Sequence, residues 1–363
     1  MLEFSKANWN LIVYSLGLVY SVYLCFLSTR QLLRGHRWQC FGFLLATLMA
    51  VYMGTRPLNM YGDSQLYSTI FKLVQDGAWV DFKSSGKEWV WDVIEWFFVR
   101  HADASSWFLL IDIVYVSAYA VVCWRWMPRR STTAFMFVAT SLSFFSYATN
   151  GIRQGMAAAL CILALGVLPS DRNRPDWPRL TVCLTLLYLG FSTHTSMQLF
   201  AAATIATIIW PSQKIPFYVW MTCLVLSPLS QVFIGMAPQM FEDNRMAHYG
   251  QLIAVGVFSR SGWRWDFILY SALPVVLAYW VMFRKKMHDV TYVRLMSVYM
   301  YVNATWLLVN SIPYSNRFAY ISWCIYPVIV AYPLLKFRLI RHQGLLAGGI
   351  MAMFIVLTMI FDF

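Results

Sequence analysis

Long apolar runs alternate with short polar segments along the chain. About 12 runs are long enough, or nearly so, to cross roughly 30 Å of hydrocarbon. They cover residues 9–29, 39–55, 106–124, 132–149, 152–168, 180–194, 196–210, 215–235, 265–283, 291–311, 318–335 and 344–361. Several are short, and the pair around His194 also fits one broken or re-entrant element, so the count is about 10 to 12. The pattern predicts an all-α, polytopic integral membrane helix bundle, with residues 1–363 forming a single transmembrane domain.

The composition narrows the class of protein. Hydrophobic residues make up 60% of the 363 residues and charged residues only 12%, whereas a soluble domain has about 25% charged residues. This balance excludes a soluble enzyme, a disordered protein and a disulfide scaffold. The seven Cys lie in or beside apolar runs without a CxxC pair, so we interpret them as small core residues. The run that starts near Trp9 has no small-residue cleavage site after it and is expected to remain as a span.

Positive charge is concentrated in every second linker between the apolar runs. The net charge is +12, and the first basic cluster, Arg30, Arg34 and Arg37, follows the first run. By the positive-inside rule these linkers are cytoplasmic, which explains the charge without nucleic acid. Both termini and the two longest loops, about 56–105 and 236–264, then face the outside. Because long loops often carry function, we expect the functional residues at this outer face.

The first long outer loop begins with a predicted amphipathic helix. Gly62 and Asp63 suit a turn and an N-cap, and residues 64–75 have the pattern of a helix that lies on the membrane surface. The charge of Asp63 would be favoured at the start of this helix. Asp63 therefore either caps the helix or takes part in chemistry.

A second helix of this loop combines acids with aromatic side chains. Glu88, Asp92 and Glu95 recur at helical spacing and share one face, while Trp89 lies elsewhere on the helix. One interpretation is an interfacial helix with a solvated acidic stripe. The alternative is a carboxylate beside a tryptophan that stacks on sugar rings.

An arginine stands at the start of the run 152–168. Asn150, Arg153 and Gln154 occupy positions i, i+3 and i+4, and the rest of the run is mainly Ala, Leu, Met and Cys. An arginine inside the membrane is costly and normally faces a cavity or a partner. At a helix start it adds to the positive field of the backbone, which suits a phosphate group. Snorkelling to the outer surface is the alternative.

Further polar residues are predicted on the same side of the membrane. His194 lies among Ser and Thr at the outer end of an apolar run, where it is either a structural or a functional residue. The last outer turn contains Tyr314, Asn316 and Arg317, and Arg56 ends the second run. If these groups converge, the guanidinium groups match a phosphate, and the acids and His194 are candidate bases.

These segments, in this order, resemble the EpsG family of Wzy-type polysaccharide polymerases. The resemblance rests on Arg56…Gly62-Asp63…Tyr67, an acidic helix near Glu88, Asn150…Arg153-Gln154, Phe191…His194-Thr195-Ser196 and Asn316-Arg317-Phe318…Tyr320. It spans most of the chain from about 50 to 335, and the order of the motifs is its strongest part. Ser64 follows the Gly-Asp pair where a Thr would be expected, which is a mild departure.

The resemblance implies an integral-membrane glycosyltransferase of the bacterial inner membrane. It would polymerise undecaprenyl-diphosphate-linked oligosaccharide repeats at the periplasmic face, with a growing glycan as donor and a single repeat as acceptor. The lipid membrane and a protein that regulates chain length are the other expected partners. No cofactor is implied, and because the chain has no DxD motif we predict a metal-independent reaction.

The implied chemistry assigns roles to the outer-face residues. Arg153 and Arg317, assisted by Arg56, would bind the diphosphate. Asp63 or Glu88 would be the base, with Asp63 slightly preferred, and His194 would orient the acceptor or hydrogen-bond the leaving group. The residues expected to contact the remaining substrate are Tyr67, Trp89, Asp92, Asn150, Gln154, Tyr314 and Asn316.

Four other functions fit parts of the sequence. An O-antigen ligase-like enzyme would use nearly the same residues and differ in its product. A flippase or exporter of lipid-linked sugars would need charges along a route through the bilayer, whereas the polar residues here cluster on one side. A membrane O-acyltransferase would have only His194 in its support. A purely structural membrane protein would not need so many arginines at the outer boundary.

Overall fold

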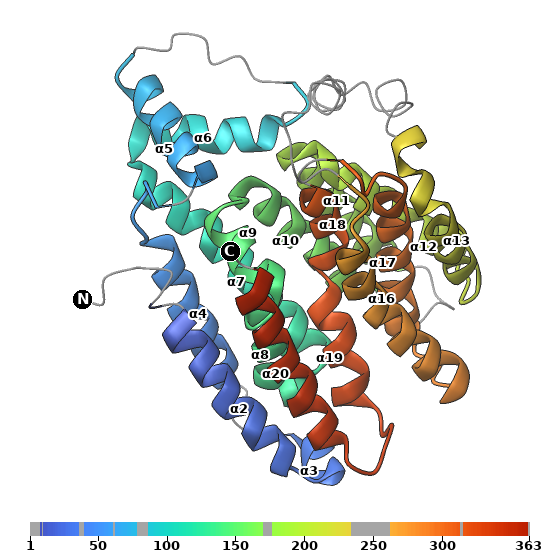
Figure 1. Ribbon diagram of the computed structural model, residues 1–363. Helices are drawn as coiled ribbons and strands as arrows, with labels where there is room; N and C mark the ends of the chain where they lie inside the picture. Colours follow the sequence, from blue (N-terminus) through green and yellow to red (C-terminus); the bar gives the residue numbers. More distant parts are fainter. Residues whose placement is uncertain are drawn as a thin grey trace. The chain divides into compact units, whose positions relative to one another are not determined.

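The computed structural model describes residues 8, 10–35, 40–60, 62–77, 86–169, 176–233, 262–312 and 315–361. These residues form helices joined by turns, without any strand (Figure 1). The chain divides into two compact units, Met1–Ala201 with Pro327–Phe363, and Ala202–Tyr326. The all-α prediction is confirmed for the described residues, and the single transmembrane domain stays a prediction.

The first unit contains helices from both ends of the chain and those of the segment predicted to be the first outer loop. Its helices are α2 (Ser15–Phe26), α3 (Thr29–Arg34), α4 (Cys40–Gly54), α5 (Gly62–Gln75), α6 (Trp89–His101), α7 (Ala104–Trp126), α8 (Ser131–Ala139), α9 (Leu142–Thr149), α10 (Ile152–Val167), α11 (Trp177–Thr193), α20 (Gln343–Phe361) and nearly all of α19 (Tyr326–Lys336). The single turns are η1 (Asn10–Tyr14), η2 (Pro128–Arg130) and η3 (Thr195–Met197). Helices α5 and α6 lie at one end of this unit (Figure 1).

The second unit is built on a buried polar network. Its elements are most of α12 (Gln198–Ile209), then α13 (Ile215–Leu226), η4 (Ser227–Leu229), α16 (Trp265–Tyr279), η5 (Trp280–Arg284), α17 (Val290–Leu308) and α18 (Ser315–Trp323). The indole of Trp220 donates to Asn303 Oδ1 at 2.8 Å. The Asn303 amide donates to the hydroxyls of Ser271 and Ser322 at 3.2 and 3.0 Å. Because the groups satisfy one another away from water, they link α13, α16, α17 and α18.

The predicted apolar runs coincide with helices, but not every run is one long helix. Among the described residues, five helices are long and apolar enough to cross a membrane: Ala104–Trp126, Ile215–Phe233, Trp265–Arg284, Ser315–Lys336 and Gln343–Ile360. Shorter apolar helices cover Leu11–Phe26, Phe41–Gly54, Ile152–Val167 and Thr195–Ile209. The count of about 12 spans is therefore not confirmed. The protein is nevertheless recognisable as a membrane protein from these helices.

The predicted run 132–149 is broken into α8 and α9. Thr140 and Ser141 form the break, and the Ser141 backbone is extended, with φ −82° and ψ 150°. The Thr140 hydroxyl donates to Met136 O at 2.8 Å, and the Ser141 hydroxyl donates to Val138 O at 2.6 Å. Such side-chain bonds compete with the backbone ladder and favour the end of a helix.

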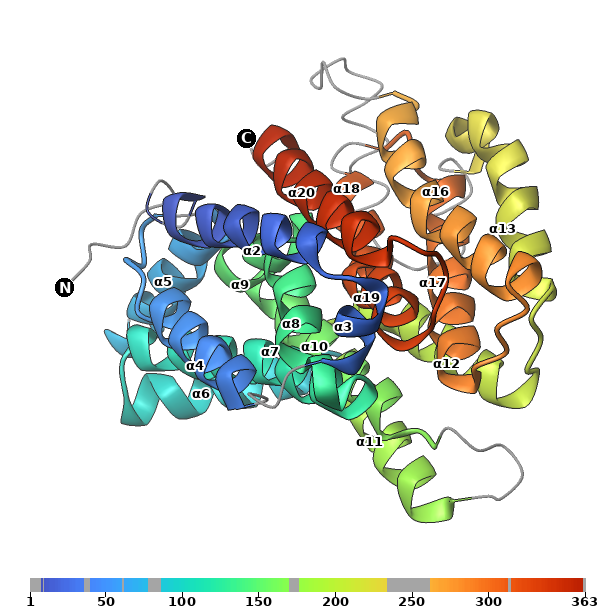
Figure 2. The same cartoon turned by 90° about the horizontal axis from the view of Figure 1, so that it is seen from below.

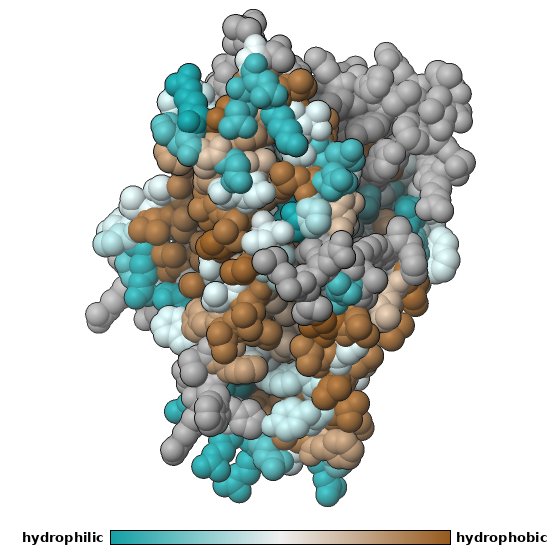
Figure 3. All heavy atoms as spheres, turned by 90° about the vertical axis from the view of Figure 1, so that its left-hand side faces the viewer, coloured by the Kyte–Doolittle hydropathy of each residue, from teal (hydrophilic) through white to brown (hydrophobic). Residues whose placement is uncertain are grey.

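Part of the first unit exposes a broad apolar surface. Large apolar side chains on α2 and α4 are exposed, among them Val19, Phe26 and Leu48, and Phe26 is 83% exposed. The face in Figure 3 has a wide hydrophobic zone between hydrophilic groups above and below. A soluble protein rarely exposes so much apolar surface, whereas contact with lipid explains it.

Helices α2 and α20 pack closely through glycines, although they come from distant parts of the chain. They lie side by side in both ribbon views (Figures 1 and 2). A Cβ atom on Gly344 would overlap the carbonyl oxygens of Leu24 and Leu27, and one on Gly348 would overlap that of Ser21. Small residues four positions apart let two backbones approach in this way.

We expect Gly348→Val to destabilise this helix pair by about 1–3 kcal/mol, because the added atoms would push α20 away from α2. The thermal midpoint of the detergent-solubilised protein measures the effect. Gly349→Val is the matched control, since a Cβ on this exposed glycine would meet nothing within 4 Å. Equal midpoints for the two variants would contradict the close packing of α2 and α20.

Candidate functional site

Helix α5 begins at the position predicted for the outer amphipathic helix. Asp63 lies in its first turn, where a negative charge is favoured. The backbone N–H of Asp63 donates to Asn150 Oδ1 at 3.0 Å. The first turn of α5 is thereby joined to the short connection between α9 and α10, and two residues predicted separately lie together.

Glu88, the N-cap residue of α6, is the centre of a polar cluster. Its Oε2 pairs with Arg153 Nη1 at 2.7 Å, and the two side chains are 7% and 20% exposed. Its Oε1 accepts hydrogen bonds from Thr195 N at 2.9 Å and from Thr195 Oγ1 at 3.0 Å. One carboxylate therefore joins the start of α6, the start of α10 and the turn η3.

Arg153 lies in the first turn of α10, as the sequence predicted. Its guanidinium carbon is 5.9 Å from the ring centre of Tyr67 and 5.9 Å from that of Trp91. The two rings are themselves in contact, with centroids 5.2 Å apart. Aromatic faces attract the cation, and Glu88 holds it by charge, so the guanidinium has a defined position between α5, α6 and α10.

His194 lies between α11 and η3 with an extended backbone, at φ −150° and ψ 118°. Its Nδ1 accepts a hydrogen bond from Ser196 N at 3.2 Å and lies 2.8 Å from Ser196 Oγ. Because a backbone N–H can only donate, Nδ1 is the acceptor, and the neutral ring carries its proton on Nε2. Since the next residue is Thr195, His194 adjoins the Glu88 cluster.

The pKa values of two acids, the N-cap residue Glu88 and Glu95 within α6, are shifted in opposite directions. Burial raises the pKa of Glu88, but the charge of Arg153 and the hydrogen bonds from Thr195 outweigh this and lower it below its ordinary value. Burial and the charge of Asp92 raise the pKa of Glu95 to about 7. At neutral pH the cluster therefore contains one firmly ionised carboxylate and one that is partly protonated.

Trp89 forms an exposed aromatic pair at the edge of this cluster. Its ring centroid is 6.3 Å from that of Tyr188 on α11, and its indole N–H donates to the Tyr188 hydroxyl at 3.3 Å. Trp89 is 37% exposed and Tyr188 is 55% exposed. Tyr188 was not among the sequence candidates, because nothing in an apolar run distinguishes it from an ordinary membrane-facing tyrosine.

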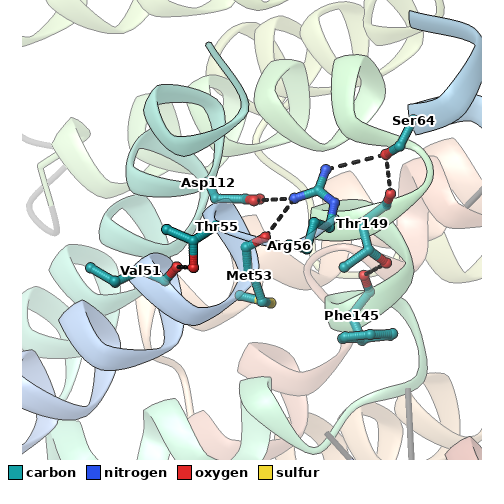
Figure 4. A network of polar contacts seen from close by, with 8 residues as sticks. All are labelled: Val51, Met53, Thr55, Arg56, Ser64, Asp112, Phe145 and Thr149. Carbon is teal, nitrogen blue, oxygen red and sulfur yellow. Dashed lines mark hydrogen bonds and ion pairs between the residues drawn. The ribbon is translucent and has the colours of Figure 1, made fainter. Parts of the chain in front are cut away.

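Arg56 lies in the interior of the first unit. Its side chain and that of Asp112 are both fully buried, and Arg56 Nη1 pairs with Asp112 Oδ2 at 2.5 Å. Arg56 Nη1 also donates to Met53 O at 2.8 Å, and Nη2 donates to Ser64 Oγ at 3.2 Å (Figure 4). Asp112 lies within the apolar helix α7 and was not a candidate from the sequence.

The remaining predicted site residues lie in both units or outside the described residues. Asp92 and Gln154 lie in the first turns of α6 and α10 and are partly exposed. Asn316 and the exposed Arg317 lie at the start of α18, which belongs to the second unit. Tyr314 and most of the second outer loop, 236–264, lie outside the described residues. The convergence of Arg317 with Arg153 stays a prediction.

Metal ligation is not apparent in the described part of the chain. No group of three or more His, Cys, Asp and Glu side chains there is arranged to hold a metal ion. The predicted metal independence of the reaction is a separate matter and stays a prediction.

The fold and this cluster define a membrane protein, helical throughout its described residues, with cationic, acidic and aromatic side chains at one end of its first unit. A family model, that of the EpsG family, matches residues 39–363. The chain therefore belongs to the EpsG family, which is a Wzy-like polysaccharide polymerase family. Neither a curated protein nor a solved structure matches the chain.

The pKa of Glu95 predicts a dependence of stability on pH. A raised folded-state pKa gives stability that is present below the ordinary value of 4.5 and is lost as the pH rises through about 7. We therefore expect Glu95→Gln to raise the free energy of unfolding at pH 8 by on the order of 1 kcal/mol, and much less at pH 5.

Thermal midpoints at the two pH values check this expectation. Asp76→Asn, at an exposed acid just after α5, is the control for a general change of charge. The expectation fails if Glu95→Gln changes the midpoint equally at pH 5 and pH 8.

Proposed function

We propose that this protein polymerises lipid-diphosphate-linked oligosaccharide repeats by glycosyl transfer at the periplasmic face of the bacterial inner membrane. The family supports polysaccharide polymerisation. The observation that carries the mechanism is the convergence of Glu88, Arg153 and Thr195 from three separate elements. Undecaprenyl diphosphate is the proposed lipid carrier of both donor and acceptor.

Arg153 is the proposed ligand of the donor diphosphate. A guanidinium has five N–H donors in a rigid fork, and the pair with Glu88 uses one of its Nη atoms. Glu88 has both oxygens engaged, by Arg153 and by Thr195. This arrangement suits Glu88 to orient Arg153. Arg317 of the second unit is a further proposed diphosphate ligand.

The transfer itself needs a base and a stabilised leaving group. A hydroxyl oxygen of the acceptor sugar attacks the anomeric carbon of the donor, and its proton passes to a carboxylate, which we assign to Asp63. The bond from the anomeric carbon to the diphosphate oxygen breaks, and the electron pair leaves with the lipid diphosphate, stabilised by Arg153. The transition state resembles an oxocarbenium ion, as in glycoside hydrolysis.

The partners of Asp63 and His194 support their proposed roles. The bond between Asp63 N and Asn150 Oδ1 joins the base to the connection that leads to Arg153. The His194 ring is oriented by Ser196, so that Nε2–H is the donor of the neutral ring. His194 then hydrogen-bonds the acceptor or the leaving group. Trp89, beside Glu88 in the chain, would stack on a sugar ring.

Arg153→Ala should lower polymerisation about 100-fold or more, because removal of a transition-state donor costs this much in other enzymes. The measurement is elongation of a purified lipid-linked repeat, with products separated by length. Glycan on a different acceptor, in place of longer lipid-linked chains, would favour ligation over polymerisation.

Two further variants separate chemistry from folding. Arg153→Ala/Glu88→Gln leaves no unpaired buried charge, and it should fold like the wild type and remain inactive. Arg100→Ala, at an exposed arginine stacked on Trp96 in α6, should keep full activity. Normal polymer length from a well-folded Arg153→Ala protein would overturn the assignment of Arg153.

A further inference from the structure

The Arg56–Asp112 pair lies at a place where α4 and α7 already pack closely. A Cβ atom on Gly54 would overlap the backbone of Leu109, so the two helices meet directly at this level. Arg56 follows Gly54, the last residue of α4, by two positions, and Leu109 precedes Asp112 by about one turn of α7. Contact between α4 and α7 therefore does not need an ion pair.

Burial of the Arg56–Asp112 pair also costs desolvation free energy that an apolar contact would not. Both side chains are fully buried, and within the described residues Arg56 Nε and Asp112 Oδ1 have no hydrogen-bond partner. Apolar side chains of similar size at two such positions often give equal or greater stability. Stability alone thus gives no reason for this pair.

The pair differs from an apolar contact because it reaches a third element. Arg56 Nη2 donates to Ser64 Oγ, and the Ser64 hydroxyl donates to the carbonyl oxygen of Thr149 (Figure 4). Ser64 follows Asp63 in α5, and Thr149 precedes Asn150 at the end of α9. The chain of contacts runs from Asp112 in α7 through Arg56, just after α4, and Ser64 in α5 to the end of α9.

This chain of contacts runs beside the bond between Asp63 N and Asn150 Oδ1. Two neighbouring residues of α5 are thus bonded to two neighbouring residues at the end of α9. Arg56 donates to Ser64, which makes one of these two bonds. The ion pair with Asp112 fixes the direction of the Arg56 guanidinium.

We propose that Arg56 and Asp112 are positioning residues that dock the first turn of α5 on the α9–α10 connection and thereby set the geometry between Asp63 and Arg153. This inference rests on the proposed glycosyl transfer for its effect on activity. Arg56 then acts through Ser64 and does not touch the diphosphate, in contrast to the role predicted from the sequence. Asp112 gains a role that the sequence did not suggest.

The test compares Arg56→Met/Asp112→Leu with the wild-type protein in detergent. Replacement of both charges should leave the thermal midpoint at or above that of the wild type. Amide hydrogen exchange of residues 62–75 should become faster, while exchange in α4 and α7 stays unchanged. In the elongation assay kcat should fall at least about tenfold, with KM for the acceptor within about twofold. The reason is that misplaced catalytic groups weaken mainly the interactions that are made in the transition state.

Ser64→Ala is the second variant, because it breaks the link to α5 and keeps the ion pair. It should show the same faster exchange and lower kcat even if the double variant fails to fold. Thr55→Ala is the matched control, since Thr55 directly follows α4 and, among the contacts in Figure 4, its hydroxyl bonds only to Val51 O of α4.

Wild-type exchange of α5 in a folded double variant or in Ser64→Ala would overturn the proposal, and so would wild-type kcat. If the wild-type protein itself forms no polymer, the proposed function fails. In that case the amide hydrogen exchange of α5 still shows whether the Arg56–Asp112 pair docks this helix.

Discussion

Charge that is buried between apolar helices must be matched by opposite charge, and two ion pairs in the described part of the first unit meet this constraint. Glu88 pairs with Arg153 where α6 and α10 begin, and Arg56 pairs with Asp112 between α4 and α7. In each case the loss of one partner would leave the other charge without compensation in a region of low polarity. The positions of the paired side chains are thus restricted by electrostatics as well as by packing.

The same constraint shapes the chemistry available to α6. Glu88 is kept ionised by its partners, whereas Glu95, two turns later, is shifted toward its neutral form by burial and by Asp92. One short helix therefore offers an anion that orients a cation and a carboxyl group that exchanges protons near neutral pH. The opposite pKa shifts of Glu88 and Glu95 need only differences in local environment along one helix face.

Local features of the fold were predictable from the sequence, and pairings were not. Apolar runs identify the helices, and Arg153 is conspicuous because a charged residue opens an otherwise apolar run. The partner of Arg56 is 56 positions away, inside a run that we counted simply as a span. The contact between Glu88 and Thr195 joins residues 107 positions apart. A single sequence carries no signal for such contacts.

The lengths of the helices also could not be predicted from hydropathy alone. Hydropathy treats 132–149 as one segment, whereas two hydroxyl groups that bond to the preceding turn divide it into α8 and α9. The division between α9 and α10 similarly depends on the connection at Asn150, whose amide oxygen accepts from α5. Periodicity shows where residues are apolar, but side-chain bonds to the backbone determine where each helix stops.

The glycine contacts of α20 with α2 have a consequence for the order of assembly during translation. The ribosome completes α2 early and delivers α20 only after about three hundred further residues. Until then the carbonyl groups of Ser21 and Leu24 lack the neighbour whose backbone fits against them. The nascent first unit thus stays open along one side, and its closure is among the last steps of folding.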